Sequence, residues 1–445
     1  MVALALLTVG AVLRPDRLIR IASGATSQNV CSGTFVTGLD PDRVYREEIR
    51  PEGGMGLIAW ALHYDVDRDA RRVRTRILDG FETTSAFHDG YGCRLEFPNA
   101  VPLAPVPPRA ESRPVDDIAG PDPVPPTDRA LTRALDAAFA PEEDGAARFT
   151  RAIVVVHDGR VIAERYATGI GVDTPLLSHS LAKSVTNALV GILVRQGKLS
   201  LDRTLAPPAW SGAAVNVDQL LRMTSGLPLD EGAGPGLAQQ MWFTEPDGDA
   251  FAEKTPLAAE PGRKWAYGNL GYAVLSRLVR DAAGGTPRSV AEFAERELFA
   301  PLGMMRALLE FDGAGSPMGS NAFFASARDW ARFGLLYLND GVANGRRILP
   351  EGWVGDATRR TLDTGYGAGF WLDVTDAPME VWPGAHWGMP GAPQDAYFGR
   401  GYLGQYIVVV PSEHLVVVRM GVSRARGGGI EGMGALVHDV IEALH

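Results

Sequence analysis

The chain has 445 residues, of which 46% are hydrophobic and 22% are charged, a composition typical of a globular protein with a large buried core. Its net charge of −10 argues against a nucleic-acid partner, because such partners require a basic surface. The two cysteines, Cys31 and Cys93, are too few for a disulfide framework or a four-ligand zinc site, and they form either one bridge in an exported protein or two unpaired thiols.

The chain begins with an apolar run from Val2 to Leu13, which three arginines follow within the next seven residues. This run is too short to span a bilayer, which takes about 20 residues. A secretion signal would carry its positive charge before the apolar run. We interpret the run as the remnant of an anchor or signal, or as a buried first element. We favour an envelope location, and membrane association through the N-terminus stays open.

Composition divides the chain into three regions. Residues 1–97 form an N-terminal extension of unassigned role, with strand-like runs over 56–64 and 72–78 and no recognisable catalytic pattern. Residues 98–127 form a Pro-rich linker, with ten prolines that predict an extended linker or a strap over the surface. Residues 128–445 have the pattern of one mixed domain of helices and strands.

The periodicity of the third region predicts its elements. Helices are predicted over 128–140, 181–196, 216–223, 271–283, 290–299, 327–338 and 433–444. Strands are predicted over 152–157, 161–166, 406–410 and 415–420, the first two joined by an Asp-Gly hairpin turn. Because the strands lie at both ends of the domain, we expect an α+β fold in which both termini build one antiparallel sheet that helices cover.

The first chemical motif is S-H-S-L-A-K at residues 178–183, at the start of a predicted helix. Residues three apart share one face of a helix, so the Lys183 amine can reach the Ser180 hydroxyl. A serine becomes nucleophilic when a neighbouring base takes its proton, and a lysine can be that base when burial keeps it neutral. The pair predicts nucleophilic catalysis by Ser180, with the helix N-terminus supporting the oxyanion.

Other interpretations of this motif stay open. A serine cap followed by a solvated lysine gives the same S-x-x-K pattern. Ser184 is a second candidate serine, but no lysine lies three residues after it. His179 is adjacent to Ser180, and since neighbouring helical residues point in different directions, we interpret His179 as a packing residue.

The second motif is P-G-R-K-W-A-Y-G-N at residues 261–269, before another predicted helix. The phenol of Tyr267 beside a lysine can relay a proton to a leaving group. The amide of Asn269 offers a donor and an acceptor to the lysine or to a substrate. A half-buried tyrosine and a capping asparagine would give the same pattern.

Taken together, the motifs resemble those of the serine β-lactamase and penicillin-binding-protein superfamily, and most closely those of class C β-lactamases, related esterases and 6-aminohexanoate-dimer (nylon-oligomer) hydrolases. The resemblance covers residues 128–445, whereas about the first 100 residues lie outside it. It also rests on G-K-L-S-L-D at 197–202, L-L-R-M-T-S-G-L at 220–227, P-L-G-M at 301–304 and S-A-R-D-W-A-R-F at 326–333. Met223 stands where the family has histidine.

The resemblance implies a β-lactamase-like fold in which Ser180 is acylated, Lys183 is its base and Tyr267 shuttles a proton to the leaving group. Asn269 would contact the lysine or the substrate. The family's third motif, K-[TS]-G, cannot be present as such, because no lysine follows Lys264.

Alignment on the strand at 404–408 places Gly399-Arg400-Gly401 where that motif would lie. The resemblance then implies that the backbone N–H groups of Ser180 and Tyr402 form the oxyanion hole. In the family this lysine helps to hold a substrate carboxylate, so its absence predicts poor β-lactam turnover. Arg400 is a candidate to replace its charge, and Gly401 is a candidate to line the substrate site.

Two further residues are candidates for the substrate site. Trp242, within M-W-F at 241–243, would form an apolar wall for an acyl chain or pack in the core, and His386 would line the site or pack in its loop. The acidic stretch 245–249 has no histidine near it, and we interpret it as a solvated loop. Because no phosphate loop or zinc signature occurs, we expect neither a metal nor a cofactor.

These observations predict a serine hydrolase of small-molecule esters or amides that acts through an acyl-enzyme on Ser180, with esters of modest size favoured and linear amides next. An acyltransferase, or a penicillin-binding or sensor protein that is acylated and stalls, is the main alternative. A catalytically inactive binding protein is another, and a true β-lactamase fits less well. The oligomeric state is not predicted.

Overall fold

The structure is a computed structural model that describes residues 15–107, 117–142, 145–231, 236–373, 379 and 387–445. The apolar run over residues 2–13 lies outside these ranges. Of the helices within them, none combines the length and hydrophobicity that crossing a bilayer requires.

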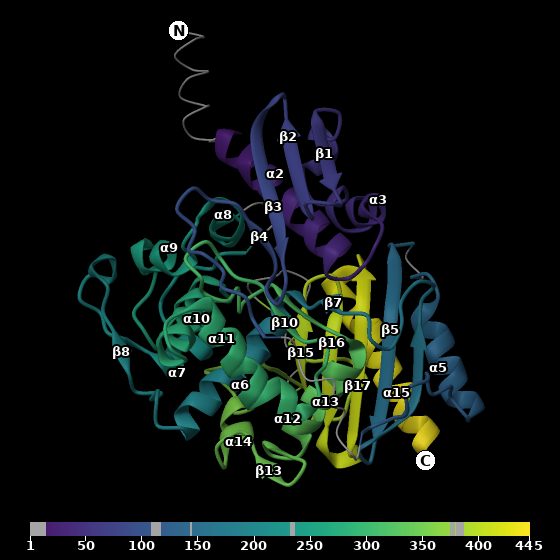
Figure 1. The fold of residues 1–445 in the computed structure, drawn as a ribbon. Helices are drawn as coiled ribbons and strands as arrows, with labels where there is room; N and C mark the ends of the chain where they lie inside the picture. The colour runs from purple at the N-terminus through teal and green to yellow at the C-terminus, as the bar shows by residue number, and fades with distance from the viewer. Residues whose placement is uncertain (1–14, 108–116, 143–144, 232–235, 374–378, 380–386) are drawn as a thin grey trace.

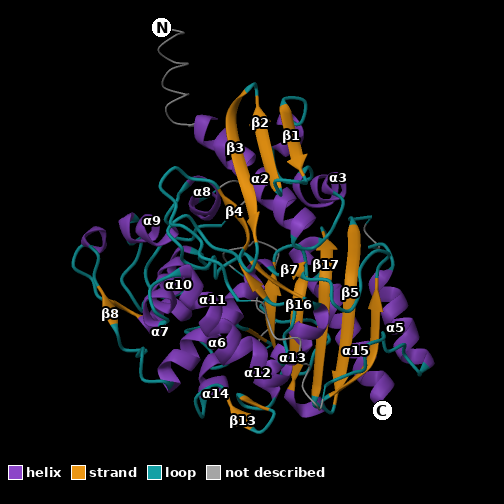
Figure 2. Cartoon of the chain, viewed as in Figure 1, coloured by secondary structure: helices purple, strands orange, loops and turns teal. Residues whose placement is uncertain are grey.

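The main domain is built on a six-stranded antiparallel sheet with the strand order β14-β15-β16-β17-β5-β6 (Figure 2). Two strands come from the start of the domain, β5 (Arg148–His157) and β6 (Arg160–Tyr166). Four come from its end, β14 (Trp371–Leu372), β15 (Tyr397–Gly401), β16 (Gln405–Val410) and β17 (Leu415–Ser423). β17 pairs with β5, so the prediction of one antiparallel sheet built from both termini is confirmed.

Helices cover both faces of this sheet (Figure 1). On one face, α5 (Arg129–Phe139) and α15 (Ile430–Leu444) pack together, and on the other α13 (Ala327–Leu338) lies across β16, β17 and β5. Gly334 permits this close approach, since a Cβ atom there would lie 2.5 Å from a methyl carbon of Val416. Because both faces are covered, β16 and β17 are buried along their whole length, which their valine-rich sequences fit.

Further helical segments and short strands complete the main domain. Every helix predicted for this domain is present, and 290–299 is divided into α11 and a π-helical segment, η4. The helical segments are η2 (His179–Leu181), α6 (Ala182–Arg195), η3 (Pro208–Trp210), α7 (Val217–Leu221), α8 (Leu237–Thr244), α9 (Gly248–Lys254), α10 (Leu270–Ala282), α11 (Pro287–Ala294), η4 (Glu295–Phe299), α12 (Ala300–Leu302), α14 (Trp353–Ala357), η5 (Pro411–Glu413) and η6 (Arg426–Gly428). The short strands are β7 (Leu176–Leu177), β8 (Thr204–Leu205), β9 (Val215–Asn216), β10 (Leu308–Leu309), β11 (Phe323–Ala325), β12 (Val342–Ala343) and β13 (Arg346–Arg347).

The N-terminal extension forms its own layer, in which the long helix α2 (Pro15–Phe35) packs on a four-stranded antiparallel sheet (Figure 1). The strands are β1 (Leu62–Asp67), β2 (Arg72–Ile77), β3 (Gly80–His88) and β4 (Gly92–Leu95). Between α2 and β1 lie α3 (Pro41–Val44), the π-helical segment η1 (Tyr45–Ile49) and α4 (Met55–Ile58).

The prediction of a strand over 72–78 is confirmed by β2, whose buried and exposed residues alternate. The prediction of a strand over 56–64 is wrong in its first half, where α4 lies, and β1 begins only at Leu62. A short apolar run fits a buried helical turn as well as a strand, so its sequence alone does not separate the two.

The extension is fastened to the main domain beside a disulfide between Cys31 on α2 and Cys93 on β4. Next to it, the Glu310 carboxylate from the main domain accepts hydrogen bonds from Ser32 Oγ (2.7 Å), Gln28 Nε2 (2.8 Å) and the Cys93 backbone N–H (2.8 Å). Burial raises the pKa of Glu310 to about 8, although these three hydrogen bonds oppose the rise. A disulfide is typical of exported proteins, whereas the envelope location itself stays a prediction.

The described parts of the Pro-rich segment, 98–107 and 117–127, contain neither helix nor strand and lie along the main domain. The Val124 N–H donates to the Glu164 carboxylate on β6 (2.7 Å), and the Glu164 N–H donates back to the Val124 carbonyl (2.8 Å). Arg328 on α13 donates to the carbonyls of Gly120 (2.6 Å) and Asp122 (2.7 Å). These contacts give this part of the segment the form of a strap against the edge of the sheet.

Replacing Cys31 and Cys93 with alanine is expected to lower the free energy of unfolding of the extension by about 2–4 kcal/mol, because the reduced chain regains the entropy of the loop between them. Denaturant unfolding, monitored by proteolysis of the extension, measures the change in this free energy. A midpoint unchanged from that of untreated wild type would contradict the disulfide's role, and wild type reduced with dithiothreitol is the control that should unfold like the variant.

Glu310 predicts a pH dependence of stability. Its folded-state pKa of about 8 lies above the value of about 4.3 expected in the unfolded chain, so the folded state keeps the proton longer. The stability that this group contributes is full below pH 4 and is lost as the pH rises through 8. We expect the wild type to lose stability relative to Glu310→Gln between pH 5 and pH 9 in denaturant unfolding. Parallel pH profiles for the two proteins would show that Glu310 does not titrate in this way.

Candidate active site

The structure brings Ser180 and Lys183 together where the chain turns into helix α6. Ser180 lies in the 3₁₀ turn η2, and Lys183 is the second residue of α6, whose first twelve residues are buried. The Lys183 Nζ lies 2.9 Å from Ser180 Oγ. Ser184, the other candidate serine, is completely buried and donates to the Gly369 carbonyl, so only Ser180 opens to the pocket described below.

Lys183 is 2% exposed, and its amine sits among three acceptors. Besides Ser180 Oγ, Nζ contacts Asn269 Oδ1 (2.6 Å) and the Ser320 carbonyl (3.0 Å). Burial lowers the pKa of Lys183 to about 8, against the opposing charges of Glu231 and Asp230. A substantial fraction of the amine is therefore neutral slightly above neutral pH, as a base for Ser180 requires.

Asn269 lies behind Lys183 rather than in the pocket. It is completely buried, and its Nδ2 donates to Asp230 Oδ1 (2.9 Å) and Glu231 Oε1 (2.6 Å), while its oxygen faces the lysine. Asp230 also accepts from the backbone N–H groups of Asn269 (2.6 Å) and Leu270 (2.8 Å), at the start of α10. Of the two sequence-based expectations for Asn269, the geometry favours the contact to the lysine over the contact to a substrate.

Tyr267 lies beside Lys183 and Ser180. The Tyr267 ring is stacked on the Trp371 ring, with 5.7 Å between their centroids. The Lys183 Nζ lies 4.8 Å from the centroid of the Tyr267 ring. Burial raises the pKa of Tyr267 well above its ordinary value, and a hydrogen bond with Ser180 opposes this. The phenol thus keeps its proton at neutral pH and can act as a donor beside the serine.

The segment L-L-R-M-T-S-G-L holds the loop that carries Tyr267. The Met223 carbonyl accepts from the Ala266 N–H (3.0 Å), and the Thr224 carbonyl accepts from the Gly262 N–H (2.7 Å). Met223 is buried and does not line the pocket that Ser180 faces. In this chain the segment therefore positions the loop through its backbone.

Gly399-Arg400-Gly401 lies on β15, next to the turn that carries Ser180. Gly401 is needed for this contact, because a Cβ atom there would lie 2.1 Å from the Ser178 carbonyl oxygen. Arg400 donates to the Gly427 carbonyl (2.7 Å) and lies over the Trp371 ring, while its Nη1 has no hydrogen-bond partner among the described residues. Arg400 and Gly401 thus border the same space as Ser180.

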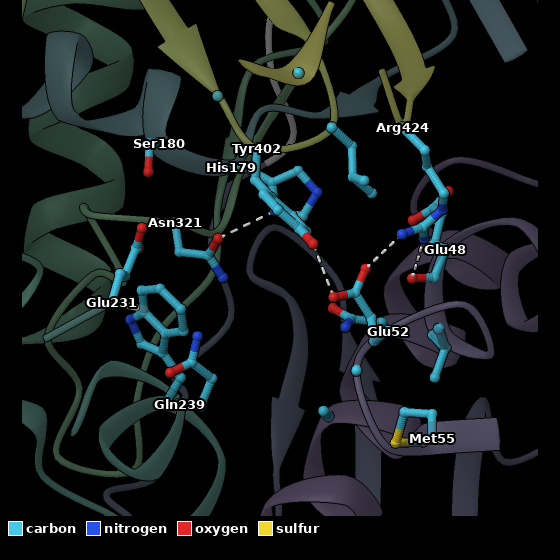
Figure 3. A pocket seen from close by; sticks show the side chains of 18 of the residues that line it. Glu48, Glu52, Met55, His179, Ser180, Glu231, Gln239, Asn321, Tyr402 and Arg424 are labelled. Carbon is cyan, nitrogen blue, oxygen red and sulfur yellow. Dashed lines mark hydrogen bonds and ion pairs between the residues drawn. The ribbon is translucent and has the colours of Figure 1, made fainter. Parts of the chain in front are cut away.

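This space is a pocket of about 960 Å³, which Figure 3 shows from close by. Ser180, Glu231 and Gln239 lie on its main-domain side, and Glu48, Glu52 and Met55 come from the N-terminal extension opposite them. Tyr402 lies between the two sides, and its hydroxyl donates to Glu52 Oε2 (2.8 Å). The pocket is at the upper end of the size range of small-molecule sites.

The other predicted site residues are placed as follows. Trp242 lines the pocket and donates to Ser320 Oγ (3.1 Å), whereas His386 lies outside the described residues. His179, interpreted from its sequence position as a packing residue, lines the pocket as well, with Nδ1 3.2 Å from Asn321 Oδ1 and its ring edge-on to Tyr402. Its φ of 48° is costly for a residue other than glycine, as is common beside catalytic groups.

The interpretation of 245–249 as a solvated loop is wrong for its last two residues, because α9 begins at Gly248 and both residues are buried. Asp249 is buried near the start of α9 and forms an ion pair with Arg277 on α10 (2.6 Å). The partner lies 28 residues further along the chain, too far for a local pattern to reveal it. Within the described part of the chain, no three His, Cys, Asp or Glu side chains are grouped closely enough to hold a metal ion.

Sequence reasoning missed Asp230, Glu231, Ser320 and the whole contribution of the N-terminal extension to the pocket. Asp230 and Glu231 follow the S-G-L segment after two intervening residues, but no spacing ties them to Lys183. The extension lies outside the resemblance, so nothing in its sequence indicated that it faces Ser180.

Comparisons with known proteins agree with this geometry. The family model described as Beta-lactamase matches residues 135–426. A 6-aminohexanoate-dimer hydrolase from Paenarthrobacter ureafaciens is 26% identical over 293 residues, which cover 61% of this chain and 72% of the relative. Penicillin-binding protein 4 of Amycolatopsis lactamdurans is 27% identical, over 56% of this chain and 73% of that protein.

The crystal structure of a family VIII carboxylesterase superposes with a TM-score of 0.54 and 15% identity, covering 72% of this chain and 98% of the carboxylesterase. This likeness supports the fold. Since the family model matches well over half of the chain, the resemblance to the serine β-lactamase and penicillin-binding-protein superfamily is confirmed, and the protein belongs to the Beta-lactamase family.

Proposed function

We propose that the protein is a serine hydrolase that cleaves ester or linear amide bonds through an acyl-enzyme on Ser180. The observation that carries this proposal is the contact of 2.9 Å between Ser180 Oγ and the buried amine of Lys183, with the phenol of Tyr267 hydrogen-bonded to Ser180. The name of one relative, a 6-aminohexanoate-dimer hydrolase, supports hydrolysis as the reaction class.

In the proposed reaction, neutral Lys183 takes the Ser180 proton as Oγ bonds to the substrate carbonyl carbon. The N–H groups of Ser180 and Tyr402 stabilise the oxyanion. Tyr267 then protonates the leaving alcohol or amine as its bond to carbon breaks, and the proton held by Lys183 restores the phenol. Water attacks the acyl-enzyme by the same route in reverse, which releases the acid and free Ser180.

The network behind Lys183 explains how the base is held. Asn269 fixes the amine with its oxygen, and Asp230 and Glu231 fix Asn269 in turn. These carboxylates also raise the pKa of Lys183 and so limit the effect of burial. The network therefore sets both the position and the protonation of the proposed base.

Acyl transfer to an alcohol or amine, or an acylated protein that stalls, is the alternative that uses the same acylation step. Arg400 borders the pocket, where it is the candidate to hold a substrate carboxylate in place of the missing lysine of the third motif. Partition of product between water and an added nucleophile separates hydrolysis from transfer.

Brief exposure to p-nitrophenyl butyrate is expected to add a butyryl group to Ser180, which intact mass and peptide mapping detect. Ser180→Ala should lose the adduct and at least a thousandfold of the rate of nitrophenol release, because the nucleophile is removed. Ser184→Ala is the matched control and should keep the adduct. An adduct that persists in Ser180→Ala would overturn the assignment.

The rate of acylation is expected to rise with pH with a midpoint near 8, because the amine of Lys183 acts as a base only after it loses its proton. Glu231→Gln removes a negative charge that favours the protonated amine, so the midpoint should move to lower pH. Single-turnover acylation rates between pH 6 and 10 measure the midpoint in wild type and in Glu231→Gln. A profile that falls over this range, or a midpoint that moves upward in Glu231→Gln, would contradict the role of Lys183.

A further inference from the structure

The pocket that Ser180 faces extends across to the N-terminal extension. Residues of α2 and of the segment from η1 to α4 line its far side, among them Ile21, Ala25, Met55 and Ile58. None of these residues lies in the part of the chain that the family model matches. The extension thus adds a second half to a pocket whose first half holds the reacting serine.

The extension is held rigidly against the main domain at this point. Arg424, which follows β17, donates to Glu52 Oε1 and to the carbonyls of Glu47 and Glu48, each at 3.1 Å. Arg151 on β5 forms a buried ion pair with Glu48. The carboxylates of Glu48 and Glu52 are thus paired with arginines of the protein, so neither carboxylate requires a cationic ligand.

Apart from Asn29, the remaining side chains that line the pocket on this side are apolar, and they are continuous with Trp242. α2 and α8 pack so closely that a Cβ atom at Gly24 would lie 2.4 Å from the Phe243 carbonyl oxygen. Ile21, Ala25, Trp242 and Phe243 pack together in one hydrophobic cluster and all border the pocket. Trp242 in turn contacts Ser320, whose carbonyl faces Lys183. An apolar wall therefore runs from Trp242, which lies next to Ser320, to helix α2 of the extension.

We propose that this half of the pocket, formed by the N-terminal extension and α8, binds an aliphatic chain of the substrate. The substrates are then esters or amides that carry a chain longer than butyryl on one side of the scissile bond. The inference rests on the proposed function, which it deepens by naming the substrate class. The pocket volume of about 960 Å³ is several times what a butyryl ester needs and suits such a chain.

The expected size of the effect follows from apolar burial. Each methylene that moves from water into an apolar site contributes about 0.8 kcal/mol, which corresponds to roughly a fourfold gain in kcat/KM. Part of this gain is offset by the ordering of the chain. We therefore expect the octanoyl ester to exceed the butyryl ester by at least about tenfold in kcat/KM.

The experiment measures kcat/KM of the full chain in two substrate series below their critical micelle concentrations. p-Nitrophenyl butyrate, hexanoate and octanoate place the chain on the acyl side, and ethyl, butyl and octyl acetates place it on the alcohol side. A rise with chain length in either series supports the proposal and shows which side enters this half of the pocket. Flat or falling profiles in both series overturn it.

Two variants test whether the extension is responsible. Ala25→Phe fills the pocket from α2, and Leu57→Asp places a charge on an exposed leucine that borders it. Leu78→Asp is the matched control, since Leu78 is also an exposed leucine of the extension but does not border the pocket. We expect the ratio of kcat/KM for the octanoyl ester to kcat/KM for the butyryl ester to fall by about three- to tenfold in the first two variants. In the control this ratio should stay within about twofold of wild type.

The ratio separates this inference from general damage and from the proposed function. A folding defect lowers kcat/KM for the octanoyl and butyryl esters alike and leaves their ratio unchanged. If that ratio is unchanged in both Ala25→Phe and Leu57→Asp, the inference is overturned. If butyrate turnover does not depend on Ser180, the proposed function fails. If that turnover depends on Ser180 while both chain-length profiles stay flat, only the aliphatic-chain site fails.

Discussion

The site depends on one constraint, which is that the amine of Lys183 is buried and held by three acceptors. An ammonium group loses hydration when it is buried, so its neutral form gains relative weight. The acceptors Ser180 Oγ, Asn269 Oδ1 and the Ser320 carbonyl restrain Nζ from three different parts of the chain. Turn η2, the start of α10 and the loop before β11 must therefore be in register for the pair to form. The large sheet and its covering helices supply that rigidity.

The N-terminal extension shares the site with the main domain. It is tied on by the Glu310 carboxyl group, by Arg424 and by Arg151, which are polar side chains of the main domain that bond to the extension. The same contacts bring Glu52 to the hydroxyl of Tyr402, whose backbone N–H is the proposed second donor to the oxyanion. Docking of the extension and the shape of the pocket are thus physically coupled, although the extension carries none of the family motifs.

The sequence predicted the main domain well because its signals are local. The α5 and α13 helices, the valine-rich strands and the Ser180–Lys183 spacing each follow from residues a few positions apart. What could not be predicted depends on long-range contacts. The pairing of Asp249 with Arg277, the position of Asp230 behind Asn269 and the docking of α2 through Glu310 join segments that no local periodicity relates. The disulfide was one of two open alternatives until the fold placed Cys31 beside Cys93.

The most direct test of the account is the protonation of Lys183 itself. The chain contains only four lysines, so labelling their side-chain nitrogens gives an NMR spectrum in which Lys183 can be assigned by its absence in a Lys183→Met variant. The account predicts that this amine titrates with a pKa of about 8. A Lys183 amine that stays protonated up to pH 10 would contradict its role as the base for Ser180.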